Sequence, residues 1–109
     1  MRPTEAAVLR RLDALIAKGD KVAQTAQLVK GISPPLYRLD DGLYANWWTQ
    51  SIHALTSLLG ETSNYTRAFV KQVDEYPWRR QLNTGMGILK AIREDAAEGH
   101  LLNSDVNGQ

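Results

Sequence analysis

The sequence predicts an all-α fold, a compact bundle of about five helices. Apolar residues recur at helical spacing in several segments, while no useful stretch alternates apolar and polar residues and no repeat of fixed period occurs. The 109 residues, 43% of them hydrophobic, suffice for one core and are too few for two ordinary domains. We therefore expect a single helical domain over residues 1–102 and a flexible polar tail over residues 103–109.

Two helices are expected in the first third of the chain. The first begins after Thr4, a good N-cap residue, and ends at Gly19; the second runs from Asp20 to Gly31. Two prolines follow in the segment 32–39, where they remove backbone donors and favour extended geometry. We expect this segment to be a surface loop, anchored by three side chains: Leu36, Tyr37 and Leu39.

The strongest helix of the middle region is expected over residues 43–59, closed by Gly60. Its apolar residues form one continuous stripe: Tyr44, Trp48, Ile52, Leu55 and Leu59. Trp47 lies beside this stripe, at a flank that either another helix or a partner chain must cover.

Two more helices complete the prediction. Ser63 can cap a fourth helix that stops before Pro77, and a fifth ends at Gly99. The fifth carries an apolar face at about 100° per residue, made of Leu82, Gly85, Ile88, Leu89, Ile92 and Ala96.

Gly85 is the most informative residue of that face. A glycine inside a helix costs roughly 1 kcal/mol against alanine, so it predicts the close approach of a large side chain. We expect Trp48 to fill this notch, and we expect Gly85→Leu to unfold or strongly destabilise the domain. Gly87 lies on the opposite face, where the sequence offers no reason for a glycine.

Charge and composition narrow the class of protein. Thirteen Lys and Arg against 12 Asp and Glu leave a net charge of +1, which argues against a chain built mainly to neutralise phosphates or to coat a membrane. Without cysteine, disulfides and thiolate zinc sites are excluded. No apolar run approaches the roughly 20 residues of a membrane span, and the N-terminus is amphipathic, unlike a signal peptide. We expect a cytoplasmic protein.

The sequence offers no convincing catalytic, cofactor-binding or metal-binding set. His53 and His100 are the only histidines, and neither has partners at metal-ligand spacing. Arg93 and His100 match the short Arg-x(4–6)-His signature of HEPN ribonucleases, in which the arginine would stabilise the phosphate and the histidine would move a proton. Because His100 follows the helix-ending Gly99, the sequence favours an ordinary helix end over this site.

Trp78, Arg79 and Arg80 form the most basic aromatic cluster of the chain. Such a cluster could stack on bases and hold phosphates. The near-neutral net charge favours a structural role, in which the indole is buried between helices and the arginines pair with Asp74, Glu75 or solvent. We expect a partner surface near Tyr37, Trp47 and the loop prolines, and we add the cluster Trp78, Arg79 and Arg80 to the candidate interface residues.

Several motifs together resemble a known bacterial module. Trp48 and Ser51 lie on one helix, Tyr65 and Phe69 on the next, and residues 85–95 read Gly-x-Gly-Ile-Leu-Lys-Ala-x-Arg-Glu-Asp. The chain is similar, over roughly residues 20–102, to the N-terminal helical module of bacterial proteins that carry TIR-like or HEPN-like C-terminal domains.

The resemblance implies an adaptor, in proteins suspected of antiphage defence or stress response, with no catalytic residues of its own. We therefore expect a non-enzymatic interaction or oligomerisation module that self-associates or docks an effector domain, without a cofactor. The alternatives are a HEPN-like ribonuclease using Arg93 and His100, and a small nucleic-acid-binding protein.

Overall fold

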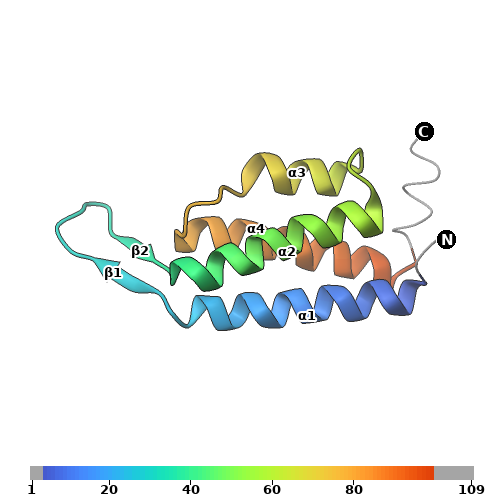
Figure 1. The fold of residues 1–109 in the computed structure, drawn as a ribbon, viewed down its shortest axis with the longest axis horizontal. Coiled ribbons are helices and arrows are strands. Elements are labelled where there is room, and N and C mark those ends of the chain that lie inside the picture. The colour runs from blue at the N-terminus through green and yellow to red at the C-terminus, as the bar shows by residue number, and fades with distance from the viewer. Residues whose placement is uncertain (1–3, 100–109) are drawn as a thin grey trace.

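The computed structural model describes residues 4–99 of the chain. These residues form four helices and one short hairpin (Figure 1). The helices are α1 (Glu5–Ala23), α2 (Asp41–Leu59), α3 (Asn64–Gln72) and α4 (Arg79–Ala97), and the strands are β1 (Gln27–Val29) and β2 (Leu36–Arg38). The tail over residues 103–109 and the candidate His100 lie outside the described residues.

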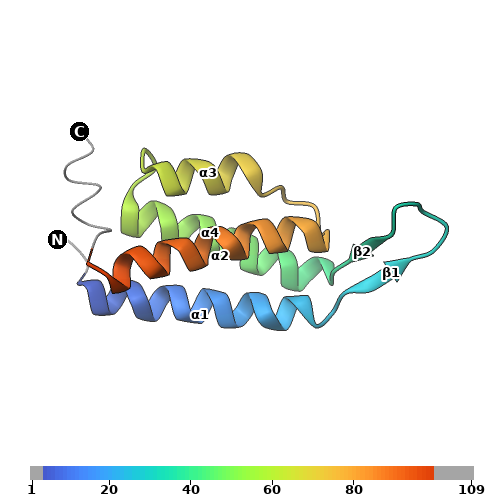
Figure 2. The same ribbon diagram turned by 180° about the vertical axis from the view of Figure 1, so that it is seen from behind.

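Successive helices run in opposite directions, as the views from the two sides show (Figures 1 and 2). Helices α1 and α3 each pack against both α2 and α4, so the four helices form an up-down-up-down bundle. The hairpin between α1 and α2 projects from one end of the bundle and lengthens the molecule, which measures 49 × 23 × 21 Å. No helix of the described chain is long and apolar enough to cross a membrane.

The mostly helical prediction is confirmed, whereas the expected all-α class and the count of about five helices fit only approximately, because the described residues form four helices and a two-stranded sheet. Helix α1 passes through Gly19, which is buried inside it, and ends at Ala23. The expected helix over residues 20–31 is therefore divided between the last turn of α1 and strand β1. The expected loop over residues 32–39 contains β2, which pairs with β1 in antiparallel register, Leu28 opposite Tyr37.

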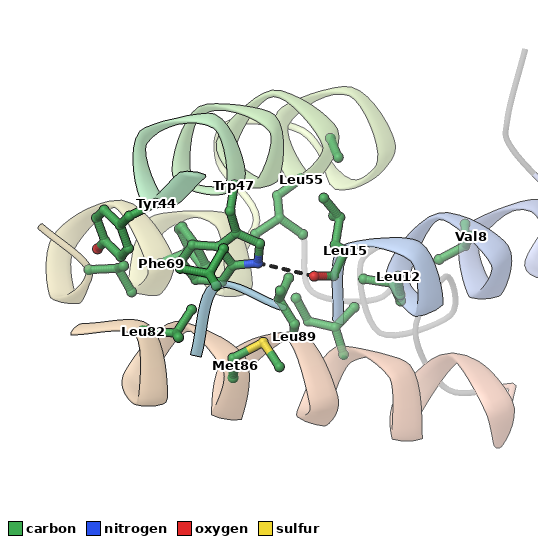
Figure 3. Close-up of a cluster of buried hydrophobic side chains, with 14 of the residues drawn as sticks. Val8, Leu12, Leu15, Tyr44, Trp47, Leu55, Phe69, Leu82, Met86 and Leu89 are labelled. Atoms are coloured by element: carbon green, nitrogen blue, oxygen red, sulfur yellow. Dashed lines mark hydrogen bonds between the residues drawn. The ribbon is translucent and has the colours of Figure 1, made fainter. Parts of the chain in front are cut away.

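Trp47 of α2 occupies the centre of the core (Figure 3). It is fully buried, and its indole Nε1 donates a hydrogen bond of 3.1 Å to the carbonyl oxygen of Leu15 on α1. Its ring packs at centroid distances of 5.7 Å from Tyr44 and 5.8 Å from Phe69. One side chain thus links α1, α2 and α3.

Trp47 also fills the notch at Gly85, so the expectation that Trp48 does so is wrong. A β-carbon on Gly85 would stand 2.6 Å from Cη2 of Trp47 and 3.1 Å from Cε2 of Phe69. A β-carbon on Gly19 would meet Sδ of Met86 first and would stand 3.0 Å from Nε1 of Trp47. Two helices therefore approach Trp47 closely because each presents a glycine there.

Trp48 has a different role, in holding the segment that joins α3 to α4. Its indole Nε1 donates to the carbonyl oxygen of Val73 at 2.9 Å, and the hydroxyl of Tyr44 donates to the carbonyl oxygen of Asp74. The backbone N–H of Asp74 in turn donates to Oε1 of Gln81 at 2.8 Å. The segment is thus fixed from both α2 and α4, and α3 ends at Gln72, several residues before the expected stop at Pro77.

Candidate functional site

Four of the five candidate interface residues meet at one end of the bundle. Tyr37 comes from β2, Trp78 is the N-cap residue of α4, and Arg79 and Arg80 begin that helix. They border a hollow of about 410 Å³, called here the hairpin–α4 groove. Its lining residues are Pro34, Pro35, Leu36, Tyr37, Trp78, Arg79, Arg80 and Asn83.

The hairpin is attached to the start of α4 through its backbone. Arg38 and Trp78 form an antiparallel β-bridge, and the N–H of Leu39 donates to the carbonyl oxygen of Pro77 at 2.7 Å. Nη2 of Arg38 lies 3.0 Å from Oδ1 of Asp41, which ties the end of β2 to the first turn of α2. These contacts set the position of Tyr37, which lies in β2 next to Arg38, relative to α4.

A cation–π contact joins the two walls of the groove. The guanidinium carbon of Arg79 lies 3.6 Å from the centroid of the Tyr37 ring. This contact covers one face of the ring and holds the charge of Arg79 at the groove.

The groove carries uncompensated positive charge. None of its lining residues is acidic, and within residues 4–99 neither Arg79 nor Arg80 forms an ion pair. The expected ion pairs of these arginines with Asp74 or Glu75 are therefore not found. The backbone N–H of Asp74 donates a hydrogen bond to the side chain of Gln81.

The first turn of α4 adds to this charge. The N-terminal end of a helix carries a partial positive charge, so acidic residues are favoured there and basic residues are not. This turn contains no acidic residue, begins with two arginines, and receives no hydrogen bond from the side chain of its N-cap residue, Trp78. An anion bound in the groove would offset the excess positive charge of this turn, and it would accept hydrogen bonds that the N-cap side chain does not.

Trp47 does not belong to this site. We expected it at a flank covered either by another helix or by a partner chain, and the structure shows the first alternative, because Trp47 is fully buried in the core. Trp78 is only partly buried, and among the described residues its indole N–H has no hydrogen-bond acceptor. Of the two tryptophans offered as interface residues, only Trp78 can contact a partner.

Asn83 is the lining residue that the sequence reasoning missed. It follows Arg79 by four residues and Arg80 by three, so helical spacing places it on the same face of α4. The helical periodicity could have identified Asn83 once Arg79 and Arg80 were taken as interface residues.

The residues suggested for a ribonuclease site have no matching arrangement in the described chain. Nε of Arg93 forms an ion pair with Asp13 of α1, and this hydrogen bond raises the pKa of the guanidinium further. His100 lies outside the described residues. Among residues 4–99 no three His, Asp or Glu side chains gather as a metal site would require.

Comparisons with family models, with curated proteins and with solved structures gave no match to this chain. The resemblance to a bacterial adaptor module therefore remains an expectation from the motifs alone.

Proposed function

We propose that this protein is a non-enzymatic interaction module whose partner binds in the hairpin–α4 groove. The observation that carries the proposal is the pair Arg79 and Arg80, which bring charge without an internal counter-ion to the positive end of a helix. Exposed residues that lower the stability of their own helix are expected at functional sites.

The surroundings of the groove support a binding role. The hairpin side supplies Pro34, Pro35 and Leu36 as an apolar wall, and α4 supplies the charges and an amide at Asn83. An apolar surface combined with a few fixed polar groups is typical of binding sites. The groove is built on a packed bundle, so little ordering is needed when a partner binds.

The motif resemblance supports a more specific form of the proposal. In that form, the module is the adaptor of a bacterial defence or stress-response effector, and its partner is an effector domain or a second copy of the module. The start of α1 and the end of α4 lie at the end of the bundle away from the hairpin (Figure 1).

Site-specific photo-cross-linking in the native cell tests the proposal. A photoreactive residue at Asn83 should form a discrete adduct with protein, and Arg80→Glu should abolish that adduct. The same residue at Ser57, an exposed position on α2 away from the groove, serves as the control. The absence of an adduct that depends on both Asn83 and Arg80 would refute the groove as a protein-binding surface.

One observation favours nucleic-acid binding as a second candidate function. The groove combines two arginines that lack ion pairs in the described chain with the partly buried Trp78 ring, and such sites can hold phosphates and stack bases. This candidate predicts binding of single-stranded RNA or DNA that weakens steeply with salt and falls in Arg79→Ala and Arg80→Ala.

A further inference from the structure

We infer that the hairpin–α4 groove recognises an acidic segment of a partner protein, in which carboxylates flank an apolar or aromatic side chain. The inference rests on the proposed function and specifies the chemistry of the partner. It follows from the charge, the ring contact and the size of the groove.

The charge of the groove favours an anionic partner. Within the described chain, ion pairs join Arg38 to Asp41 and Arg93 to Asp13, and the other described arginines have none. Arg79 and Arg80 are unpaired as well, and both line one hollow whose lining includes no acidic residue. A guanidinium presents several N–H donors in a planar fork that matches a carboxylate, and such charge-assisted hydrogen bonds are roughly twice as strong as neutral ones.

The ring contact favours a protein segment over a nucleic acid. The guanidinium of Arg79 already covers one face of Tyr37, at 3.6 Å from the centroid, so that face cannot stack a base. Trp78 is then the one aromatic ring of the lining with no ring contact in the described structure. Proteins that hold single strands place successive bases on several rings along a basic groove, an arrangement that this site does not provide.

The size of the groove and its apolar wall indicate a short occupant. About 410 Å³ is near the lower end of typical ligand pockets. This space suits one side chain with its neighbours, and it does not suit a long polynucleotide. The wall formed by Pro34, Pro35 and Leu36 would contact an apolar side chain while Arg79 and Arg80 bind the flanking carboxylates.

Fluorescence anisotropy with three labelled probes tests the inference. The first is a short peptide in which aspartates and glutamates flank one phenylalanine, and the second has asparagine and glutamine in their places. The third is a single-stranded oligouridylate of the same formal charge as the first. We expect the acidic peptide to bind about tenfold or more tightly than the amide peptide, and more tightly than the oligouridylate.

Variants of the full chain locate the binding. Arg79→Gln and Arg80→Gln should each weaken binding of the acidic peptide by about fivefold or more, because each removes a charge-assisted hydrogen bond. Lys90→Gln, which changes the net charge equally at an exposed position of α4 outside the groove, should leave the affinity unchanged. Thermal unfolding of each variant confirms that it is folded.

Each other outcome overturns the inference. Equal affinity for the two peptides, no binding of either, or insensitivity to Arg79→Gln and Arg80→Gln would exclude recognition of carboxylates in this groove. Tighter binding of the oligouridylate would assign the groove to phosphates. A cross-linked protein adduct at Asn83 together with a failure of the acidic peptide would refute this inference and leave the proposed function standing.

Discussion

Trp47 and Gly85 are in such close contact that no side chain fits between them: a β-carbon on Gly85 would stand 2.6 Å from Cη2 of the indole. Real β-carbons essentially never approach another heavy atom this closely, so α2 and α4 can keep their spacing only with glycine at this position. The indole is also held at α1, where Gly19 lies close to its Nε1 and the carbonyl oxygen of Leu15 accepts its hydrogen bond.

Gly85→Ala should therefore destabilise the domain by about 1–3 kcal/mol, because overpacking the core outweighs the better helix propensity of alanine. Gly85→Leu should prevent folding. Urea denaturation gives the change in the free energy of unfolding, provided that the m-value is the same for the variant and the wild type. A Gly85→Ala variant as stable as the wild type would refute the contact.

Gly87→Ala is the matched control in the same helix. A β-carbon at Gly87 would meet nothing within 4 Å, so this substitution should stabilise the domain by about 0.5–1 kcal/mol through helix propensity alone. The same urea denaturation is used. Opposite signs at two positions one residue apart would be hard to explain by anything except the packing of Trp47.

The choice between Trp47 and Trp48 shows what the sequence could not resolve. Helix α2 is apolar around much of its circumference, so hydropathy defines a stripe without fixing its centre. The true core face includes Ser51 and Ala54, whose small side chains add little to the hydropathy of that face. The presence of a notch at Gly85 could be predicted, whereas the ring that fills it depends on the packing of three helices.

The hairpin was missed for a physical reason of a similar kind. Each strand has three residues, too few to show an alternating pattern, and β2 is held partly by a bridge from Arg38 to the distant Trp78. Gly19 was taken as a helix end, although it is buried within α1 because Trp47 and Met86 lie against it. Long-range contacts therefore determine both the formation of the hairpin and the continuation of α1 through Gly19.

Tyr44 should make the stability of the domain sensitive to alkaline pH. Burial raises the pKa of its hydroxyl above the usual value, and the carboxylate of Asp74 raises it further. The folded chain therefore holds this proton more tightly than the unfolded chain, in which the pKa is about 10. The resulting stability is complete below about pH 10 and is lost as the pH rises toward the folded pKa.

Tyr44→Phe should lower stability at neutral pH by about 0.5–1.5 kcal/mol, because the hydrogen bond to the carbonyl oxygen of Asp74 is lost. It should also flatten the decline above about pH 10, measured by urea denaturation at each pH. Tyr76→Phe, at a side chain that is 60% exposed, should change neither quantity. A wild-type decline that persists in Tyr44→Phe would assign the pH dependence to other groups.

Ser51 should be replaceable by alanine with a gain in stability. Its hydroxyl oxygen is fully buried on α2 and has no hydrogen-bond partner among the described residues. A buried hydroxyl without a partner costs about 1–3 kcal/mol, and alanine has the better helix propensity. Ser51→Ala should raise the free energy of unfolding by about 1 kcal/mol, and a loss of stability on thermal or urea denaturation would contradict the assignment.

The candidate site could be predicted from the sequence in part. Trp78, Arg79 and Arg80 are consecutive and stand out as a basic aromatic cluster, but their nearness to Tyr37 depends on the hairpin that was not predicted. Asp74 and Glu75 looked like ion-pair partners because they are close in sequence, whereas among the described residues neither forms an ion pair with Arg79 or Arg80. Sequence proximity did not determine which charges would remain uncompensated.

Arg80→Glu separates the stability of α4 from its binding function. Replacing a cation by an anion in the first turn favours the helix dipole, so the free protein should become more stable by about 0.3–1 kcal/mol. The same change should abolish binding of the acidic peptide, because it places a like charge in the groove. Denaturation and anisotropy on one preparation measure both effects. A gain in stability with loss of binding would mean that Arg80 is kept for a partner, whereas a loss of stability would mean that it serves the fold.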